Sequence, residues 1–146
     1  MLRIFLFVLF GIISSNALAN IKGKALICDK DSRGYNFISK DKVVISIINF
    51  DEQIIFPVNH SYELSENAIF IQQPINVLKQ EKKTKPIGWI FRRTLDYVSL
   101  DYVNGDWKRK FLWSCEITSP DQLDKKLKNK IDKLIKSSGN KIKELN

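Results

Sequence analysis

The feature that most constrains the fold is residues 88–117, where two β-rich runs flank Asn104-Gly105. This dipeptide is the strongest short hairpin signal, because a type I′ turn needs positive φ at both central residues. We therefore expect an antiparallel hairpin with Val103 opposite Asp106. The expected pairs further along are Tyr102 with Trp107, Asp101 with Lys108, Leu100 with Arg109 and Val98 with Phe111.

Further from the turn, the apolar positions of the first run change phase, because Leu95 and Tyr97 alternate differently from Val98 and Leu100. The second run keeps one phase as far as Ile117. Since a one-residue slip moves every side chain to the other face, the two patterns fit only with one inserted residue. We expect a β-bulge in the first run near Tyr97-Val98, which sets Leu95 opposite Trp113.

Residues 1–19 have the pattern of a cleaved signal peptide. Arg3 gives a positive start, residues 4–13 form an apolar run, and Ala17-Leu18-Ala19 matches an A-x-A cleavage site. The apolar run is too short for a permanent membrane-spanning helix, and its terminal position disfavours the alternative of a buried core helix. We expect a periplasmic or secreted bacterial protein, a monomer of residues 20–146 with no transmembrane segment.

Export determines how Cys28 and Cys115 are interpreted. In an oxidising compartment, two cysteines in a small domain are expected to form a disulfide, here between the first and last predicted strands. Metal binding is the alternative, but two cysteines and the single His60 fall short of a four-ligand site. A redox role is weaker because the chain has no C-x-x-C motif. We predict neither a metal nor a cofactor.

Short strands at close spacing account for the chain between residues 24 and 78. No helical periodicity interrupts them, and Pro57 and Pro74 restrict the ladder. The pattern predicts a mainly β domain of residues 20–118, an antiparallel meander closing as a small barrel or a sandwich. The expected strands are residues 24–29, 35–39, 43–49, 53–58, 62–64, 68–72 and 75–78.

Residues 119–146 have the pattern of an amphipathic helix that is packed on the β domain or appended to it. Ser119 is expected as N-cap, with Pro120 at the first helical position and Gln122 three residues after the cap. Residues 137–140 are expected to end the helix. We prefer docking on the sheet to a membrane surface, because the apolar face is narrow and lacks Trp or Phe. That face comprises Leu123, Leu127, Ile131, Leu134 and Ile135, flanked by lysines.

Little in the sequence indicates catalysis. His60, the only histidine, is expected to be a surface residue in a loop, and Asp96 and Asp101 should point to opposite faces of a strand. Glycine-rich phosphate loops and nucleophile motifs are absent. We predict a protein without catalytic residues, although catalytic groups that converge only in space would leave no such pattern.

Basic residues indicate the class of partner. Of the 24 lysines and arginines, removal of Arg3 leaves 23 against 16 acidic residues, a net charge of +7. Export excludes most nucleic acids, so an acidic envelope protein, anionic lipid or polysaccharide is expected. The alternative is that aromatics face the core, bases face water and the loop is merely solvated. The candidate basic and aromatic surface is Trp89, Arg92, Arg93, Trp107, Lys108, Arg109 and Lys110, and the candidate binding loop carries Lys79, Lys82, Lys83 and Lys85.

Two segments carry a resemblance to known proteins: Trp89-Ile90-Phe91-Arg92-Arg93-Thr94-Leu95 and Phe111-Leu112-Trp113-Ser114-Cys115. With them, the chain resembles small uncharacterised exported bacterial proteins with an early and a late cysteine. In outline it is also similar to the periplasmic inhibitors of C-type lysozyme, small β-barrels with a Ser-Gly loop motif and a following Tyr. The corresponding Ser32-Arg33-Gly34-Tyr35 departs from that motif, so no functional residue is transferred.

These observations favour a non-catalytic periplasmic or envelope binding protein or inhibitor. The alternative is an envelope protein associated with membrane or polysaccharide through its Lys-rich C-terminal helix.

Overall fold

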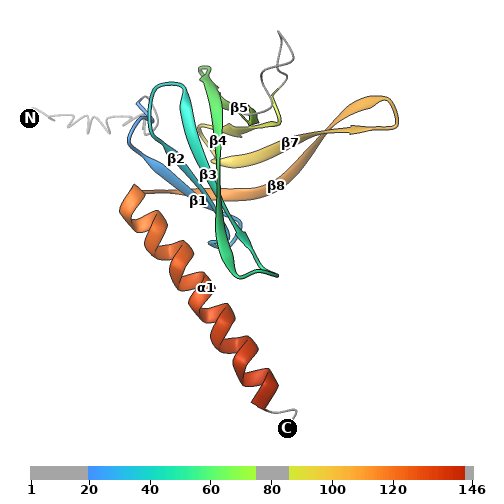
Figure 1. Ribbon diagram of the computed structural model, residues 1–146. Helices are drawn as coiled ribbons and strands as arrows, with labels where there is room; N and C mark the ends of the chain where they lie inside the picture. The colour runs from blue at the N-terminus through green and yellow to red at the C-terminus, as the bar shows by residue number, and fades with distance from the viewer. Residues whose placement is uncertain (1–19, 75–85, 144–146) are drawn as a thin grey trace, which may run out of the picture.

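The computed structural model describes residues 20–74 and 86–143, in which eight antiparallel strands form a closed barrel (Figure 1). Each strand pairs with its neighbours in sequence, and β8 closes on β1. The expected antiparallel β fold is confirmed, and the closure is that of a barrel. The elements are β1 (Ala25–Cys28), β2 (Arg33–Phe37), β3 (Lys42–Asn49), β4 (Ile54–Leu64), β5 (Ala68–Pro74), β6 (Gly88–Phe91), β7 (Asp96–Val103), β8 (Asp106–Thr118) and α1 (Pro120–Lys143).

The Asn104-Gly105 hairpin has the predicted register from Val103–Asp106 to Val98–Phe111. Both turn residues have positive φ, 54° at Asn104 and 83° at Gly105, as a type I′ turn requires. The local turn rule therefore sets the pairing of β7 with β8.

The predicted bulge is near Tyr97-Val98, but it lies on the other strand. Tyr97 pairs with Trp113 and Val98 with Phe111, so the unpaired extra residue is Leu112 of β8. The prediction that Leu95 faces Trp113 is wrong, because Leu95 belongs to the turn between β6 and β7 and has a φ of 60°. The phase change in the first run reflects a switch of the apolar residues from the interior face at Tyr97 to the outer face at Val98 and Leu100.

The predicted segments 53–58 and 62–64 form one long strand, β4, despite Pro57. Pro57 pairs with Ser46 of β3, while β5 pairs with β4 only from His60 onward. Because β5 is not paired with this part of β4, the missing N–H of Pro57 removes no hydrogen bond to β5. A strand tolerates proline at such an unpaired position. The predicted strand 75–78 lies outside the described residues.

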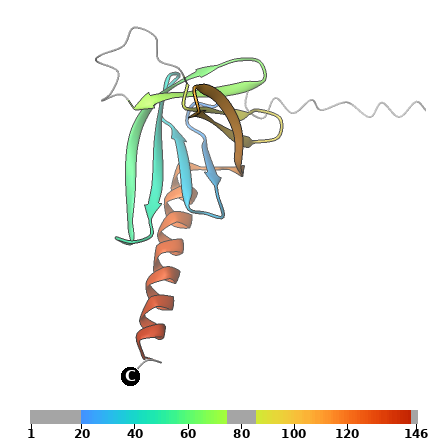
Figure 2. The ribbon, with the colours of Figure 1, turned by 90° about the vertical axis from the view of Figure 1, so that its right-hand side faces the viewer.

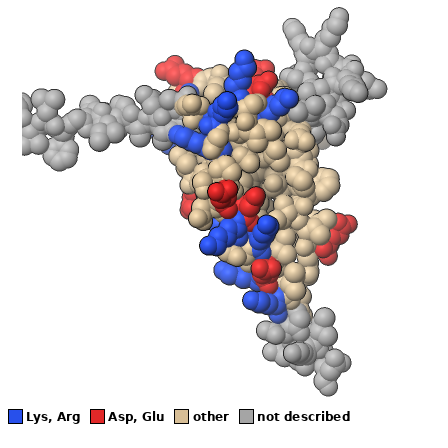
Figure 3. Space-filling view, turned by 60° about the vertical axis from the view of Figure 1, so that its left-hand side comes forward, with Lys and Arg blue, Asp and Glu red and all other residues tan. Residues whose placement is uncertain are grey.

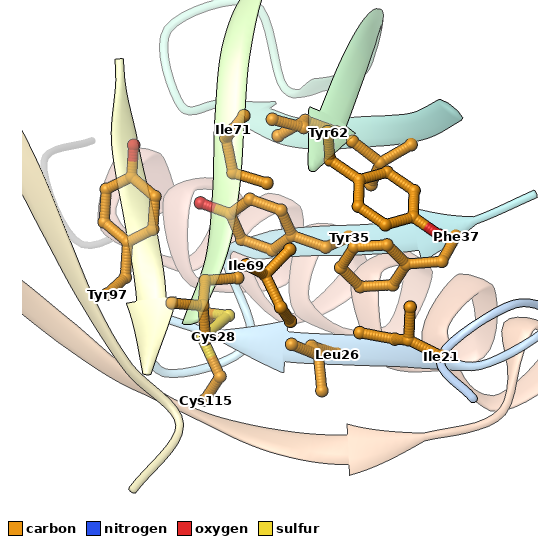
Figure 4. Packing of buried hydrophobic residues seen from close by; sticks show 13 residues of the cluster. Ile21, Leu26, Cys28, Tyr35, Phe37, Tyr62, Ile69, Ile71, Tyr97 and Cys115 are labelled. Carbon is orange, nitrogen blue, oxygen red and sulfur yellow. A yellow bond between two sulfur atoms is a disulfide. The ribbon is translucent and has the colours of Figure 1, made fainter. Parts of the chain in front are cut away.

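The barrel interior is filled by side chains that alternate along the strands (Figure 4). Phe37 and Tyr62 meet edge to face with ring centroids 5.0 Å apart, and Leu26, Ile69 and Ile90 are completely buried. Cys28 pairs with Cys115 in the β1–β8 register, and the predicted disulfide joins them. The bond therefore lies inside the barrel, at the seam where the first strand meets the last.

The helix α1 starts as predicted and docks on the outside of the barrel (Figures 1 and 2). The backbone N–H of Gln122 donates to the Ser119 hydroxyl at 3.3 Å, which is the predicted N-cap. Leu123 and Leu127 are 1% and 0% exposed, and pack with three barrel residues, Ala25, Ile27 and Ile48. The first half of the apolar face thus belongs to a second core between helix and sheet.

The second half of α1 differs from the prediction, because the helix continues through residues 137–140 to Lys143. The hydroxyls of Ser137 and Ser138 donate to the Leu134 carbonyl oxygen at 2.8 and 3.0 Å. Both hydroxyls therefore form hydrogen bonds within the helix, and the serines do not end it. The C-terminal part extends beyond the strands (Figure 1), and Ile135 is 47% exposed. Lysines and acidic residues are interspersed along this part of the surface (Figure 3).

Candidate recognition surface

A third cluster of apolar side chains lies on the outer face of β5, β6 and β7. Trp89 and Val98 point outward because their neighbours Ile90 and Tyr97 face the interior core. Trp89 is only 8% exposed although it lies on the outer face of the barrel. The cluster consists of Ala68, Trp89 and Val98, with Phe70 and Leu100 packed against them.

Aromatic rings and one arginine complete this surface. Phe70 and Phe91 each lie 6.3 Å from Trp89, measured between ring centroids, and the Arg109 guanidinium carbon lies 5.3 Å above the Trp89 ring. Phe91 is 37% exposed, and Phe111, which pairs with Val98, is 59% exposed. We call Phe70, Trp89, Phe91, Phe111 and Arg109 the outer aromatic face.

The other members of the predicted basic surface are placed differently. The Arg92 Nη1 donates to the carbonyl oxygens of Ser65 and Glu66 at 2.8 and 3.2 Å, so Arg92 holds the turn between β4 and β5. Arg93 is exposed beside it. Lys108 and Lys110 are exposed and alternate with Arg109 along β8, so they point to the opposite face. The structure thus brings together Trp89 and Arg109, but not the whole predicted set.

Five other predicted residues lie wholly or partly outside the part of the chain that the structure describes. Trp107 lies in β8 opposite Tyr102, and its side chain lies outside the description. The candidate loop residues Lys79, Lys82, Lys83 and Lys85 lie outside the described residues altogether.

A second group of polar side chains was missed by the sequence analysis and lies inside the barrel. Arg33 begins β2 and has the same strand parity as Tyr35, so it shares the interior face. Its guanidinium carbon lies 4.4 Å from the centre of the Trp113 ring, which stacks on Tyr97 at 4.9 Å. The alternation of Arg33, Tyr35 and Phe37 was the signal that could have identified an inward-pointing arginine.

The prediction that His60 is a surface loop residue is wrong. His60 lies in β4, faces the interior and is 6% exposed. Its Nδ1 lies 2.8 Å from the Gln72 carbonyl oxygen, and a carbonyl only accepts, so the ring donates from Nδ1. The loop expectation failed because it relied on Pro57 ending the strand before His60.

Burial lowers the pKa of His60 below its ordinary value of 6.5, and the hydrogen bond to Gln72 opposes this shift only partly. The unfolded chain therefore binds a proton more readily than the folded protein. The resulting stability is present above pH 6.5 and is lost as the pH falls below that value. We expect urea-unfolding stability to decrease between pH 7 and pH 5, by up to about 1.4 kcal/mol per pH unit from this one group.

The matched variant is His60→Gln, which cannot titrate in this range. Its stability should change less between pH 7 and pH 5 than that of the wild type, whatever its absolute stability. Equal pH dependence in the two proteins would show that His60 is not the group responsible.

Comparison with protein-family models, curated proteins and solved structures finds no match to this chain. Within residues 20–74 and 86–143, no three side chains among His, Cys, Asp and Glu are grouped so that they could hold a metal ion. In the same part of the chain, no helix has both the length and the apolar character needed to cross a membrane. The functional argument therefore depends on the geometry of the two sites above.

Proposed function

We propose that this protein is an exported, non-catalytic binding protein of the bacterial envelope, and that it recognises an acidic protein through its outer aromatic face. The observation that carries the proposal is Arg109 lying over Trp89, on the same face of the barrel as the exposed rings of Phe91 and Phe111. Aromatic and arginine side chains contribute most of the binding energy at many protein interfaces. An arginine on such a face favours a partner that presents a carboxylate.

Two features support export. The signal-peptide pattern of residues 1–19 predicts translocation, and the Cys28–Cys115 disulfide is consistent with an oxidising compartment. A barrel closed by hydrogen bonds and a disulfide also suits recognition, because a rigid surface loses little conformational entropy on binding.

The test is a pull-down from envelope extract with the disulfide-intact protein and three single variants. Arg109→Glu reverses the charge over Trp89, Phe111→Ser removes the most exposed ring of the face, and Ile135→Ser makes a similar change on α1 as the control. The wild type and Ile135→Ser should recover one stoichiometric protein. Arg109→Glu should lose it and Phe111→Ser should retain less, by at least tenfold and severalfold respectively.

Recovery of the same protein by Arg109→Glu would contradict the assignment of this face. Recovery of lipid or polysaccharide, lost on removal of α1 and unaffected by Arg109→Glu, would instead support the alternative of an envelope protein that acts through its Lys-rich helix.

A further inference from the structure

We propose that the barrel end beside the β1–β2 turn binds a small oxyanion, a carboxylate or phosphate group, through Arg33, Tyr35, Tyr97 and Trp113. This site is separate from the outer aromatic face, because its side chains share the interior face of the barrel. We call these four residues the interior donor cluster.

Aromatic stacking fixes the geometry of the interior donor cluster. The Trp113 and Tyr97 rings are nearly parallel, at 7° and 4.9 Å between centroids, and the Arg33 guanidinium carbon lies 4.4 Å from the Trp113 centroid. Tyr35 lies 5.9 Å from Tyr97, and its hydroxyl is directed toward the Tyr97 side of the core (Figure 4). Trp113 therefore positions both a cation and a hydroxyl group.

The position of Tyr97 also depends on Gly88. A Cβ atom at Gly88 would lie 2.6 Å from the Tyr97 hydroxyl oxygen, so a larger residue there would displace the ring. The backbone of β6 at Gly88 thus lies closer to Tyr97 than a residue with a side chain would permit.

The cluster presents donors without matching acceptors. The Arg33 Nε and Trp113 Nε1 atoms are buried and have no hydrogen-bond partner among the described protein atoms. The Tyr35 hydroxyl lies close enough to both side chains that their interaction with it opposes the rise in its pKa, but neither Arg33 Nε nor Trp113 Nε1 has the geometry of a hydrogen bond to it. Buried donors are usually paired, since leaving one unpaired costs its full desolvation penalty. Two unpaired donors on adjacent side chains therefore indicate a missing acceptor.

The charges near the cluster favour an anionic acceptor. Arg33 forms no ion pair with a described carboxylate, and desolvation raises the pKa of both Tyr35 and Tyr97, which keeps their hydroxyls protonated. Asp101 is the negative charge that acts on Tyr97, and its carboxylate accepts from the Ser99 hydroxyl at 3.3 Å. An oxyanion supplies several acceptor atoms and the charge that Arg33 lacks.

Access to the site depends on Arg33, which is partly exposed while Tyr35 is almost completely buried. A planar guanidinium at the edge of the barrel can bind either a carboxylate or a phosphate group in bidentate fashion. Carboxylate and phosphate groups are both oxyanions, and the experiment below distinguishes between them.

The experiment is a titration of the full disulfide-bonded protein with inorganic phosphate and, separately, with acetate. The indole N–H signals are followed by two-dimensional ¹H–¹⁵N NMR against a sodium chloride titration of equal ionic strength. The Trp113 signal, assigned with Trp113→Phe, should shift and saturate, while the Trp89 signal should not. Saturation with phosphate alone would assign a phosphate group, and saturation with acetate alone would assign a carboxylate.

Matched variants locate the site. Arg33→Gln should weaken binding at least tenfold, whereas Arg109→Gln, which removes the other arginine above a tryptophan, should leave it unchanged. Asp101→Asn should strengthen binding severalfold because it removes the opposing charge, and it remains informative if Arg33→Gln does not fold.

Three results would overturn the proposal. The first is a Trp113 response that sodium chloride reproduces, which would indicate screening alone. The second is the absence of a saturable shift with either anion, as expected if water satisfies the donors. The third is equal weakening by Arg33→Gln and Arg109→Gln, or no strengthening by Asp101→Asn.

Discussion

Replacement of both Leu123 and Leu127 by alanine is expected to lower the free energy of unfolding by about 4–10 kcal/mol. Both side chains are buried between α1 and the barrel, and each buried leucine truncated to alanine costs about 2–5 kcal/mol. Small domains have a total stability of about 5–15 kcal/mol, so the double variant should be close to unfolding. Urea denaturation followed by circular dichroism measures the difference.

The control is Ile135→Ala on the same helix. Ile135 is 47% exposed, so its truncation should change stability by no more than about 0.5 kcal/mol. If the double leucine variant were as stable as this control, the apolar face of α1 would not contribute to the fold, and a membrane role for the helix would gain support.

The same docking can be tested from the barrel side at Gly34. A Cβ atom there would lie 2.5 Å from Cδ1 of Leu123, so Gly34→Ala forces the leucine to move. Because Leu123→Ala removes the atom that clashes, the double variant should be less destabilised than the sum of the two single variants. Additive effects would show that Gly34 and Leu123 do not share this contact.

Features governed by local chemistry were predicted from the sequence. The positive φ of Asn104 and Gly105 set the turn and the β7–β8 register, and Ser119 set the start of α1 through one hydrogen bond. In each case, the determining residues are within a few positions of the feature.

Features governed by distant partners were not predicted. Pro57 lies within β4 because β5 begins pairing only at His60. The extra residue is Leu112 of β8, because Tyr97 pairs with Trp113 and Val98 with Phe111. The serines at 137 and 138 bond back to Leu134, so their presence alone did not end the helix. Each outcome depends on which backbone groups have partners, which the order of residues does not show.

The two candidate sites also differ in how far the sequence predicted them. Trp89 and Arg109 were both in the predicted basic and aromatic surface, but their contact requires three strands, β6, β7 and β8, to be in register. Arg33 was not in that set, because a single arginine in a short strand is ordinarily interpreted as solvent-facing. Only the barrel closure places it beside Trp113.

Removal of the disulfide by the double variant Cys28→Ala, Cys115→Ala should lower the free energy of unfolding by about 4–5 kcal/mol. The bond joins residues 87 positions apart, and in the chain-entropy model a loop of this size gives stabilisation of that order. Both cysteines are also buried, so truncation removes apolar contacts and adds to the loss. The melting temperature should fall by more than about 10 °C.

The wild type with its disulfide reduced separates the covalent link from the packing. It keeps both sulfur atoms, so it should be destabilised nearly as much as the double alanine variant if the link dominates, and by much less if packing dominates. Non-reducing mass spectrometry of the native protein should show the loss of two hydrogens and no alkylatable thiol. Two thiols that alkylate in the native protein, or a reduced wild type that melts at the oxidised temperature, would refute a stabilising bond at the β1–β8 seam.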